Sequence, residues 1–260
     1  MSSSSTYSKL FLVASICVTL ASCVPTLTEV KDITSNRAAY SNEHFSLENI
    51  SPEIRESLMK EKMSFKKHPS LTVGYSCQLD TDGGKHQEIF KRNDSYVYLG
   101  LGLSRLNTEI YKNDIAYFSD IGISYLGLID IRYQTVNYTS KFAGKIVELK
   151  SIGSFPSGLA NARPDSNYEF RGQYGTENQL TNFESGASTF KTKQVIPASQ
   201  VFASLPGDAI MVENEAKNSN EIVTSRATSY YIFDYGVSIE VSHQSASAKR
   251  ICTVQSIEIH

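Results

Sequence analysis

Runs of β-branched and aromatic residues, separated by turn-forming residues, fill most of the chain from Leu71 onward. Between Tyr231 and Val241, large apolar residues occupy every second position. Such a period of two places alternate side chains on opposite faces of a β-strand. The same pattern over residues 122–138 predicts one long strand. The chain is therefore predicted to be mainly β, with an antiparallel sandwich or barrel-like body.

One stretch favours a helix. Ser51 can cap its start, and Pro52 suits the first helical position. Ile54, Leu58 and Met59, with Met63 further on, form an apolar stripe at helical spacing. We expect one short N-terminal helix that packs on the sheet through this stripe.

The N-terminus has the three parts of an export signal. A polar start leads to a single basic residue, Lys9, and then to an apolar run from Leu10 to Leu20. This run is too short to cross a bilayer core, which needs about 20 apolar residues. The small pair Ala21-Ser22 then precedes Cys23.

The tetrapeptide Leu20-Ala21-Ser22-Cys23 resembles the lipobox of bacterial lipoproteins. The resemblance covers the first 23 residues alone. It implies that residues 1–22 are a signal peptide, and that Cys23 carries lipid on its sulfur and an acyl chain such as palmitate on its new amine. Val24, in place of Asp, implies the outer membrane. The alternatives are an ordinary secretory signal and an uncleaved N-terminal helix.

The remaining chain divides into two parts. Residues 23–50 are polar and mixed, which predicts a lipidated flexible tether. Residues 51–260 form the β-rich body, in which residues 153–186, rich in Gly, Ser, Asn and Pro, are expected to be a long loop or a boundary region.

A weak internal similarity suggests two related β-units, at about residues 65–150 and 197–260. Aligned at a constant offset, Arg92 matches Arg226 and Tyr96 matches Tyr230. If the units share a structure, these pairs should lie at equivalent strand positions. The alternative is chance similarity between strand patterns.

Charge and cysteine content limit the partners. The chain has 25 basic and 27 acidic residues, so loss of Lys9 with the signal leaves 24 against 27, a net charge of −3. This balance argues against nucleic acid or anionic lipid as the main partner. After processing, Cys77 and Cys252 are the two thiols that remain, and export to an oxidising space favours a disulfide between them. The alternative is two buried free thiols.

No residue pattern indicates catalysis, a cofactor or a metal. The five histidines, which are His44, His68, His86, His243 and His260, are scattered. Around Ser124, the segment 122–127 is one residue too long for the Gly-x-Ser-x-Gly turn of hydrolases, so its glycines more simply mark a bulge or close packing.

These observations predict a lipid-anchored envelope protein with a non-catalytic binding or structural role. Its partners are the membrane through Cys23 and an envelope protein or glycan, with no nucleic acid. The alternatives are an envelope hydrolase and an accessory subunit of an envelope assembly. A deep pocket that gathers a His with Ser or carboxylates favours the enzyme, a flat Tyr-rich face favours binding, and an exposed sheet edge or free helix favours the subunit.

Overall fold

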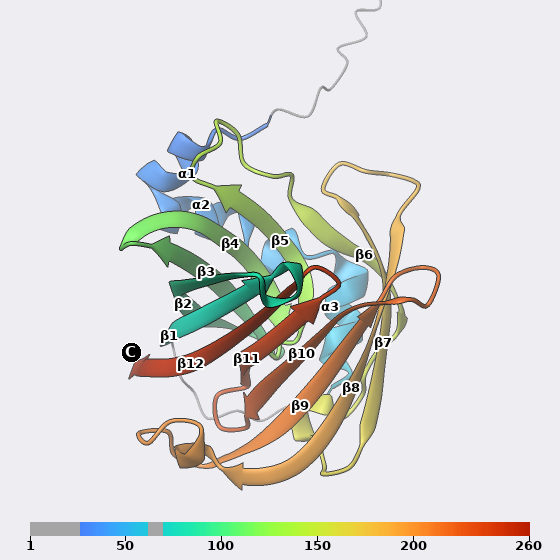
Figure 1. Ribbon diagram of the computed structural model, residues 1–260. Coiled ribbons are helices and arrows are strands. Elements are labelled where there is room, and N and C mark those ends of the chain that lie inside the picture. Colours follow the sequence, from blue (N-terminus) through green and yellow to red (C-terminus); the bar gives the residue numbers. More distant parts are fainter. Residues whose placement is uncertain (1–26, 62–69) are drawn as a thin grey trace, which may run out of the picture.

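Twelve antiparallel strands form a closed barrel in the computed structural model, which describes residues 27–61 and 70–260 (Figure 1). Each strand pairs with its neighbours along the chain, and β1 pairs with β12 to close the ring. The mainly β prediction is confirmed, and the barrel is the form that the body takes. The strands are β1 (Ser70–Thr81), β2 (His86–Gly100), β3 (Leu103–Lys112), β4 (Ile115–Tyr125), β5 (Ile129–Asn137), β6 (Val147–Ser154), β7 (Asn167–Thr176), β8 (Glu184–Pro197), β9 (Asp208–Lys217), β10 (Val223–Ile232), β11 (Val237–Ser245) and β12 (Ala248–Ile259).

The extent of pairing differs between neighbouring strands of the ring. β1 and β12 pair along almost their whole length, from Leu71 opposite Ile259 to Thr81 opposite Ala248. By contrast, β5 and β6 share two residue pairs, and β11 and β12 share three. Every described strand has two neighbours in the ring, but the short β5–β6 and β11–β12 ladders leave parts of these strands without a strand partner on one side.

The prediction of one long strand over 122–138 is wrong, because a tight turn divides it into β4 and β5. Leu126 and Gly127 both adopt left-handed backbone conformations, with φ of 55° and 67°. A large apolar residue rarely does so, which is why the sequence pattern runs through the turn unbroken. The bulge and close packing expected here are confirmed: the β4–β5 register shifts at Ile123/Ser124, and a Cβ on Gly122 would lie 2.8 Å from the Arg132 carbonyl oxygen.

Three α-helices, rather than one, precede the barrel: α1 (Val30–Ser35), α2 (Arg37–His44) and α3 (Pro52–Met59), with a short 3₁₀ turn, η1 (Leu47–Asn49). The predicted helix is α3. The Ser51 hydroxyl accepts a hydrogen bond from the Ile54 amide at 3.3 Å, and Ile54 and Leu58 are buried. Met59 is 62% exposed and lies off the packing stripe, while Met63 is outside the described residues.

The prediction of a flexible tether is wrong for residues 27–50. Ile33 and Phe45 are fully buried, and both belong to the same apolar core as Ile121 and Ile123 of β4. Backbone hydrogen bonds also join this segment to the loop after β5, from the Val30 amide to the Lys141 carbonyl at 3.0 Å. The few large apolar residues of the segment are spaced so that nearly all of them reach the core.

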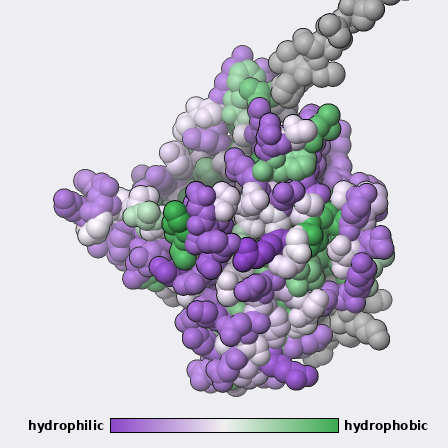
Figure 2. Space-filling model, turned by 90° about the vertical axis from the view of Figure 1, so that its right-hand side faces the viewer, coloured by the Kyte–Doolittle hydropathy of each residue, from purple (hydrophilic) through white to green (hydrophobic). Residues whose placement is uncertain are grey.

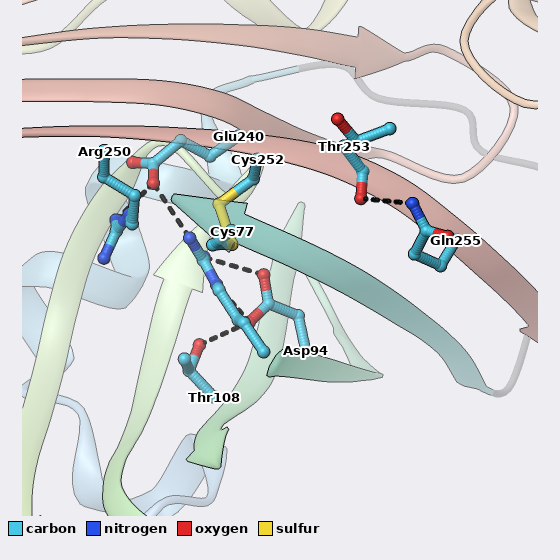
Figure 3. Close-up of a disulfide and its surroundings, with 9 residues drawn as sticks. Cys77, Asp94, Thr108, Glu240, Arg250, Cys252, Thr253 and Gln255 are labelled. Atoms are coloured by element: carbon cyan, nitrogen blue, oxygen red, sulfur yellow. Dashed lines mark hydrogen bonds and ion pairs between the residues drawn. A yellow bond between two sulfur atoms is a disulfide. The ribbon is translucent and has the colours of Figure 1, made fainter. Parts of the chain in front are cut away.

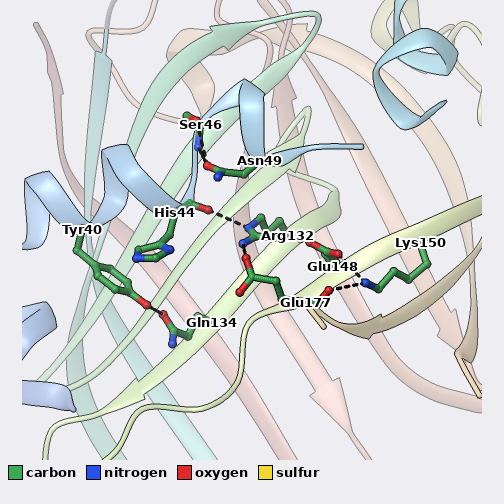
Figure 4. Close-up of polar contacts among 9 residues, drawn as sticks. All are labelled: Tyr40, His44, Ser46, Asn49, Arg132, Gln134, Glu148, Lys150 and Glu177. Atoms are coloured by element: carbon green, nitrogen blue, oxygen red, sulfur yellow. Dashed lines mark hydrogen bonds and ion pairs between the residues drawn. The ribbon is translucent and has the colours of Figure 1, made fainter. Parts of the chain in front are cut away.

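Arg132 ties the helical segment to the barrel wall. It is 2% exposed, donates to the His44 carbonyl at 2.8 Å, and forms ion pairs with Glu148 and Glu177 (Figure 4). Beside it, the Tyr40 hydroxyl donates to the Gln134 side chain at 2.7 Å. Buried charge is stable only when it is paired in this way, so the segment is fixed by polar contacts as well as by apolar packing.

One further expectation needs correction. Residues 153–186 are not a long loop, because they include the end of β6, the turn η3 (Leu159–Asn161), the whole of β7 and the start of β8. The two proposed β-units keep the same order of strands, because β1, β2 and β3 correspond to β9, β10 and β11 at the constant offset. Arg92 and Tyr96 lie on β2 and their matches Arg226 and Tyr230 on β10, although Arg92 is buried and Arg226 is exposed. The remaining short elements are η2 (Asp82–Gly84) and η4 (Ala198–Gln200).

Candidate functional site: a cavity inside the barrel

A cavity of about 860 Å³ lies inside the ring. Every strand except β6 contributes to its wall. On β3 the contribution comes from every second residue, Leu106, Thr108, Ile110 and Lys112, as expected for the inward face of a strand. Two apolar clusters flank the cavity: one joins the helices to β3–β10, and the other joins β1 and β2 to β9–β12. The cavity wall includes members of both clusters.

A cluster of buried charged residues joins β2, β11 and β12 on one side of the cavity. Arg92 donates to both carboxylate oxygens of Asp94, at 2.8 and 2.7 Å, and to Glu240 at 2.9 Å. Asp94 also accepts from the Thr108 hydroxyl at 2.8 Å, and Arg250 forms an ion pair with Glu240. Burial opposes charge at these sites, but the pKa of Arg92 is held above its ordinary value by Asp94 and Glu240. These groups therefore hold one another through hydrogen bonds and ion pairs.

The predicted disulfide is present beside this cluster. Cys77 and Cys252 face each other across the β1–β12 ladder, with Cα atoms 4.1 Å apart. Figure 3 shows the bond lying close to Asp94 and Glu240. The disulfide thus crosses the seam at which the first strand meets the last.

A second polar region contains Asp130, the first polar residue of β5. Its side chain is exposed to the space of the cavity, although the protein surrounds that space. Burial within the ring raises the pKa of Asp130 to about 6, and the charges of Asp120 and Glu240 act in the same direction. Asp120 itself accepts a hydrogen bond from the Thr135 hydroxyl at 2.7 Å.

Several buried polar atoms in the cavity wall have no hydrogen-bond partner within the described residues. Two are the hydroxyls of Ser124 and Ser238, residues that are 1% and 2% exposed. The other two are the side-chain amide oxygen of Asn214 and the Arg250 Nε. Most buried polar groups in proteins are paired. Four unpaired polar atoms around one cavity indicate that its wall is suited to hydrogen-bond a ligand.

The cavity gathers one histidine with serines and carboxylates, as the enzyme hypothesis requires. Of the described histidines, His243 alone lines the cavity, where Ser225, Ser229 and Glu240 also lie. Burial lowers the pKa of His243, and the opposing charge of Glu240 does not restore it. Within the part of the chain that the structure describes, however, the His243 ring forms no hydrogen bond with any of these groups.

The two signs of an accessory subunit differ in the described residues. β12 pairs with β11 only from Lys249 to Ile251, so residues 252–259 have no described strand partner on that side, whereas α3 is packed into the core rather than free. The surface on the side of β6–β8 is mostly hydrophilic, with small apolar areas between charged groups (Figure 2).

The lipidation site predicted at Cys23 lies outside the described residues, as does the whole signal peptide. None of the helices in the described ranges is long and apolar enough to cross a membrane. Among the same residues, no three side chains of His, Cys, Asp or Glu are arranged to hold a metal ion. Of the cavity residues, Ser124 stands in a glycine-flanked segment of the sequence, whereas no pattern marks Asp130, Ser238 or Glu240, which lie on β5 and β11 and meet only in the fold.

Comparison with known proteins gives distant structural likenesses. No protein-family model matches the chain, and no curated protein matches it. A beta-barrel-like protein of the domain of unknown function DUF1849 from Brucella abortus is 9% identical, covers 76% of this chain and 100% of its own, and has a TM-score of 0.44. A DUF1329 family protein from Desulfovibrio piger is 7% identical over 74% of this chain and 86% of its own, with a TM-score of 0.37. The hypothetical lipoprotein YmcC from Escherichia coli is 11% identical over 78% and 94%, with a TM-score of 0.35. What this chain does must therefore be argued from its own residues.

Proposed function

We propose that the protein is anchored to the outer membrane of the cell envelope by lipid on Cys23, and that its barrel binds a small amphipathic molecule without catalysis. The observation that carries the binding role is the cavity of about 860 Å³, which is within the range of about 300–1,000 Å³ typical of small-molecule sites. Its wall combines aliphatic and aromatic side chains with a few converging polar groups, which is the usual composition of such a site.

The anchor would hold the barrel close to the membrane. Leu27 follows Cys23 by four positions, and a fully extended chain spans at most about 3.6 Å per residue, or roughly 14 Å in total. The first helix already begins at Val30. The distance between the lipid on Cys23 and the folded body is therefore shorter than a flexible tether over residues 23–50 would allow.

The paired ionic groups of the cavity support binding rather than catalysis. Arg92, Asp94, Glu240 and Arg250 form ion pairs with one another, so the two carboxylates are already engaged by arginines. A general acid or base must instead exchange a proton with substrate near the working pH.

The anchoring part is tested by Cys23→Ser. The variant should leave the membrane fraction, or accumulate with its signal uncleaved, and the unaltered protein should carry the mass of its acyl chains. An unmodified mature chain in the intact-mass spectrum would contradict the proposal.

The binding part is tested with N-phenyl-1-naphthylamine, an uncharged fluorescent dye of mainly apolar surface. The full mature chain with Cys23→Ser should bind it saturably at one site. Ala227→Phe, which puts a ring into the cavity wall, should reduce this binding at least tenfold, whereas Ala246→Phe in the exposed β11–β12 turn should not. Equal binding by both variants would show that the dye binds elsewhere.

A second candidate, an envelope hydrolase, is favoured by one observation: His243 shares the cavity with serines and Glu240. Turnover of 4-nitrophenyl esters that is lost in His243→Ala and retained in His86→Ala, a change at the exposed start of β2, would support it. No turnover in the unaltered chain would leave binding as the role of the cavity.

A further inference from the structure

Asp130 differs from the other carboxylates that line the cavity. Glu88 pairs with Lys112 at 2.9 Å, Asp120 accepts from Thr135, and Glu240 is held by two arginines. Within the described residues, the Asp130 carboxylate takes part in no hydrogen bond or ion pair. It is a cavity carboxylate whose partner the described chain does not supply.

The two unpartnered serine hydroxyls lie in the same part of the wall. Ser124 is directly opposite Asp130 in the β4–β5 ladder, so the two side chains project from the same face. The β4–β5 turn brings β11 to this place: a Cβ added to Gly127 would lie 2.8 Å from the Ser238 backbone nitrogen. Because nothing in the described structure holds the two hydroxyls, each is free to turn toward a ligand.

The cations of the cavity are not available to a ligand in the same way. Arg92 is held by Asp94 and Glu240, Arg250 by Glu240, and Lys112 by Glu88. Apart from the Arg250 Nε, which has no partner within the described residues, an anionic ligand would meet donors that carboxylates already hold, whereas a cationic ligand would pair with a carboxylate that has no partner. Opposite charge next to a desolvated carboxylate is also the arrangement that offsets its burial.

We propose that the ligand carries a protonated amine, which ion-pairs with the Asp130 carboxylate and hydrogen-bonds to the hydroxyls of Ser124 and Ser238. This inference rests on the proposed function and names its ligand class. The remainder of the ligand is apolar and lies against the aliphatic and aromatic wall. An ammonium group has three donors, which matches one carboxylate and two hydroxyl acceptors.

The site also predicts a pH dependence. The titratable groups that face Asp130 are Asp120 from β4, Glu240 from β11, Tyr133 on its own strand and Tyr174 from β7, whose hydroxyl donates to the Asp130 backbone carbonyl at 3.0 Å. Because the pKa of Asp130 is raised to about 6, protonation below pH 6 removes the counter-charge. Amine affinity should therefore be highest above pH 7 and fall as the pH drops through 6.

The test uses three probes of equal chain length: octylamine, octanol and octanoate. Calorimetric titration into the full mature chain with Cys23→Ser should show octylamine binding at least tenfold more tightly than octanoate at pH 7.5, with octanol between them. Asp130→Asn should weaken octylamine binding at least fivefold and leave octanol binding unchanged. Asp114→Asn, the same change at an exposed turn outside the cavity, should alter neither.

The serines provide a second readout. The double variant Ser124→Ala with Ser238→Ala should bind octylamine several-fold more weakly while its melting temperature stays the same or rises, because the lost hydroxyls have no partner in the described structure. A purely structural role for them would instead lower the melting temperature.

The outcomes separate the two proposals. If none of the three probes binds, cavity binding fails and the amine inference fails with it. If octanol binds but octylamine shows no preference over octanoate, the cavity is a binding site and the amine inference alone is wrong. The relative affinities of the three probes for the unaltered protein test the amine inference even if Asp130→Asn does not fold.

Discussion

At the scale of residues, the interior of this barrel contains two kinds of charge. Arg92 and Asp94 are almost completely buried and bonded to each other, whereas Asp130 faces the cavity and has no partner within the described residues. Charge that is paired in this way holds the fold together, and removal of one partner leaves the other charge buried and uncompensated. A charge inside the ring without a partner has an energetic cost that a ligand can offset. The two kinds therefore predict opposite responses to mutation.

Asp94→Ala should be strongly destabilising. The change removes both oxygens that accept from Arg92 and the acceptor of the Thr108 hydroxyl. Breaking a buried pair typically costs about 3–5 kcal/mol, which urea unfolding would measure. Glu213→Gln, which breaks the half-exposed pair with Lys193, should cost less than about 1 kcal/mol. Equal losses would mean that the buried cluster contributes no more than a surface pair.

Asp130→Asn should have the opposite sign at neutral pH. A carboxyl with a raised pKa binds its proton more tightly in the folded state, so its contribution to stability is greatest below the unfolded pKa of about 4 and is lost as the pH rises through about 6. The variant should thus be more stable than the unaltered chain at pH 7.5, by up to about 1 kcal/mol because water in the cavity screens the charge. The difference should disappear near pH 4 in unfolding curves recorded at both values. A variant that is less stable at pH 7.5 would show that the carboxylate has a partner in the folded protein.

At the scale of elements, local sequence signals succeeded where a residue has a specific role. Ser51 and Pro52 located the start of α3 because a cap and a first-turn proline are local features. The helices α1 and α2 lack an apolar stripe like that of α3, and their structure is decided by packing against β3–β5. Leu126 begins a turn although its residue type favours neither the turn nor φ above zero. Sequence reasoning failed at these places because tertiary contacts outweigh propensity.

Phe45→Ala tests whether residues 27–50 belong to the body. Phe45 is fully buried after α2, so truncation should cost about 3–5 kcal/mol of unfolding free energy. Met59→Ala, at an exposed position of α3, should change it by no more than about 0.5 kcal/mol. If residues 27–50 were a tether, Phe45→Ala would be as neutral as the control.

Gly127→Ala tests the contact between the β4–β5 turn and β11. Gly127 and Gly83 have almost the same left-handed φ, 67° and 68°, but a Cβ on Gly83 meets nothing within 4 Å. Gly83→Ala should therefore cost only the backbone strain of about 1–2 kcal/mol. Gly127→Ala should cost clearly more, because its Cβ would meet the Ser238 backbone at 2.8 Å. Thermal unfolding of the two variants gives the difference, and equal losses would mean that the turn does not rest on β11.

At the scale of the whole molecule, the sequence predicted the fold class and missed the site. Alternating strands with turns between them implied a sheet with one face buried, which a barrel satisfies. The cavity residues, in contrast, are Ser124, Asp130, Ser238 and Glu240, which are separated by up to 116 positions in the chain. No spacing rule connects them, since the ring closure between β1 and β12 is what brings the C-terminal strands beside β4 and β5.

The disulfide between Cys77 and Cys252 acts at this largest scale, because it bonds the first strand to the last across a sequence separation of 175 residues. In the chain-entropy model a loop of this size is worth about 5 kcal/mol, an upper figure since the unfolded chain retains some structure. The double variant Cys77→Ser with Cys252→Ser should therefore unfold at a markedly lower temperature.

The same experiment shows what the bond contributes beyond the ladder around it. Hydrogen bonds pair β1 with β12 from Leu71 to Thr81, so the ring should still close without the disulfide, and far-ultraviolet circular dichroism below the transition should be unchanged. The unaltered protein treated with a reductant should melt at the temperature of the double variant. If reduction and the double variant both leave the melting temperature unchanged, the ladder alone holds the seam and the covalent bond adds no stability to the barrel.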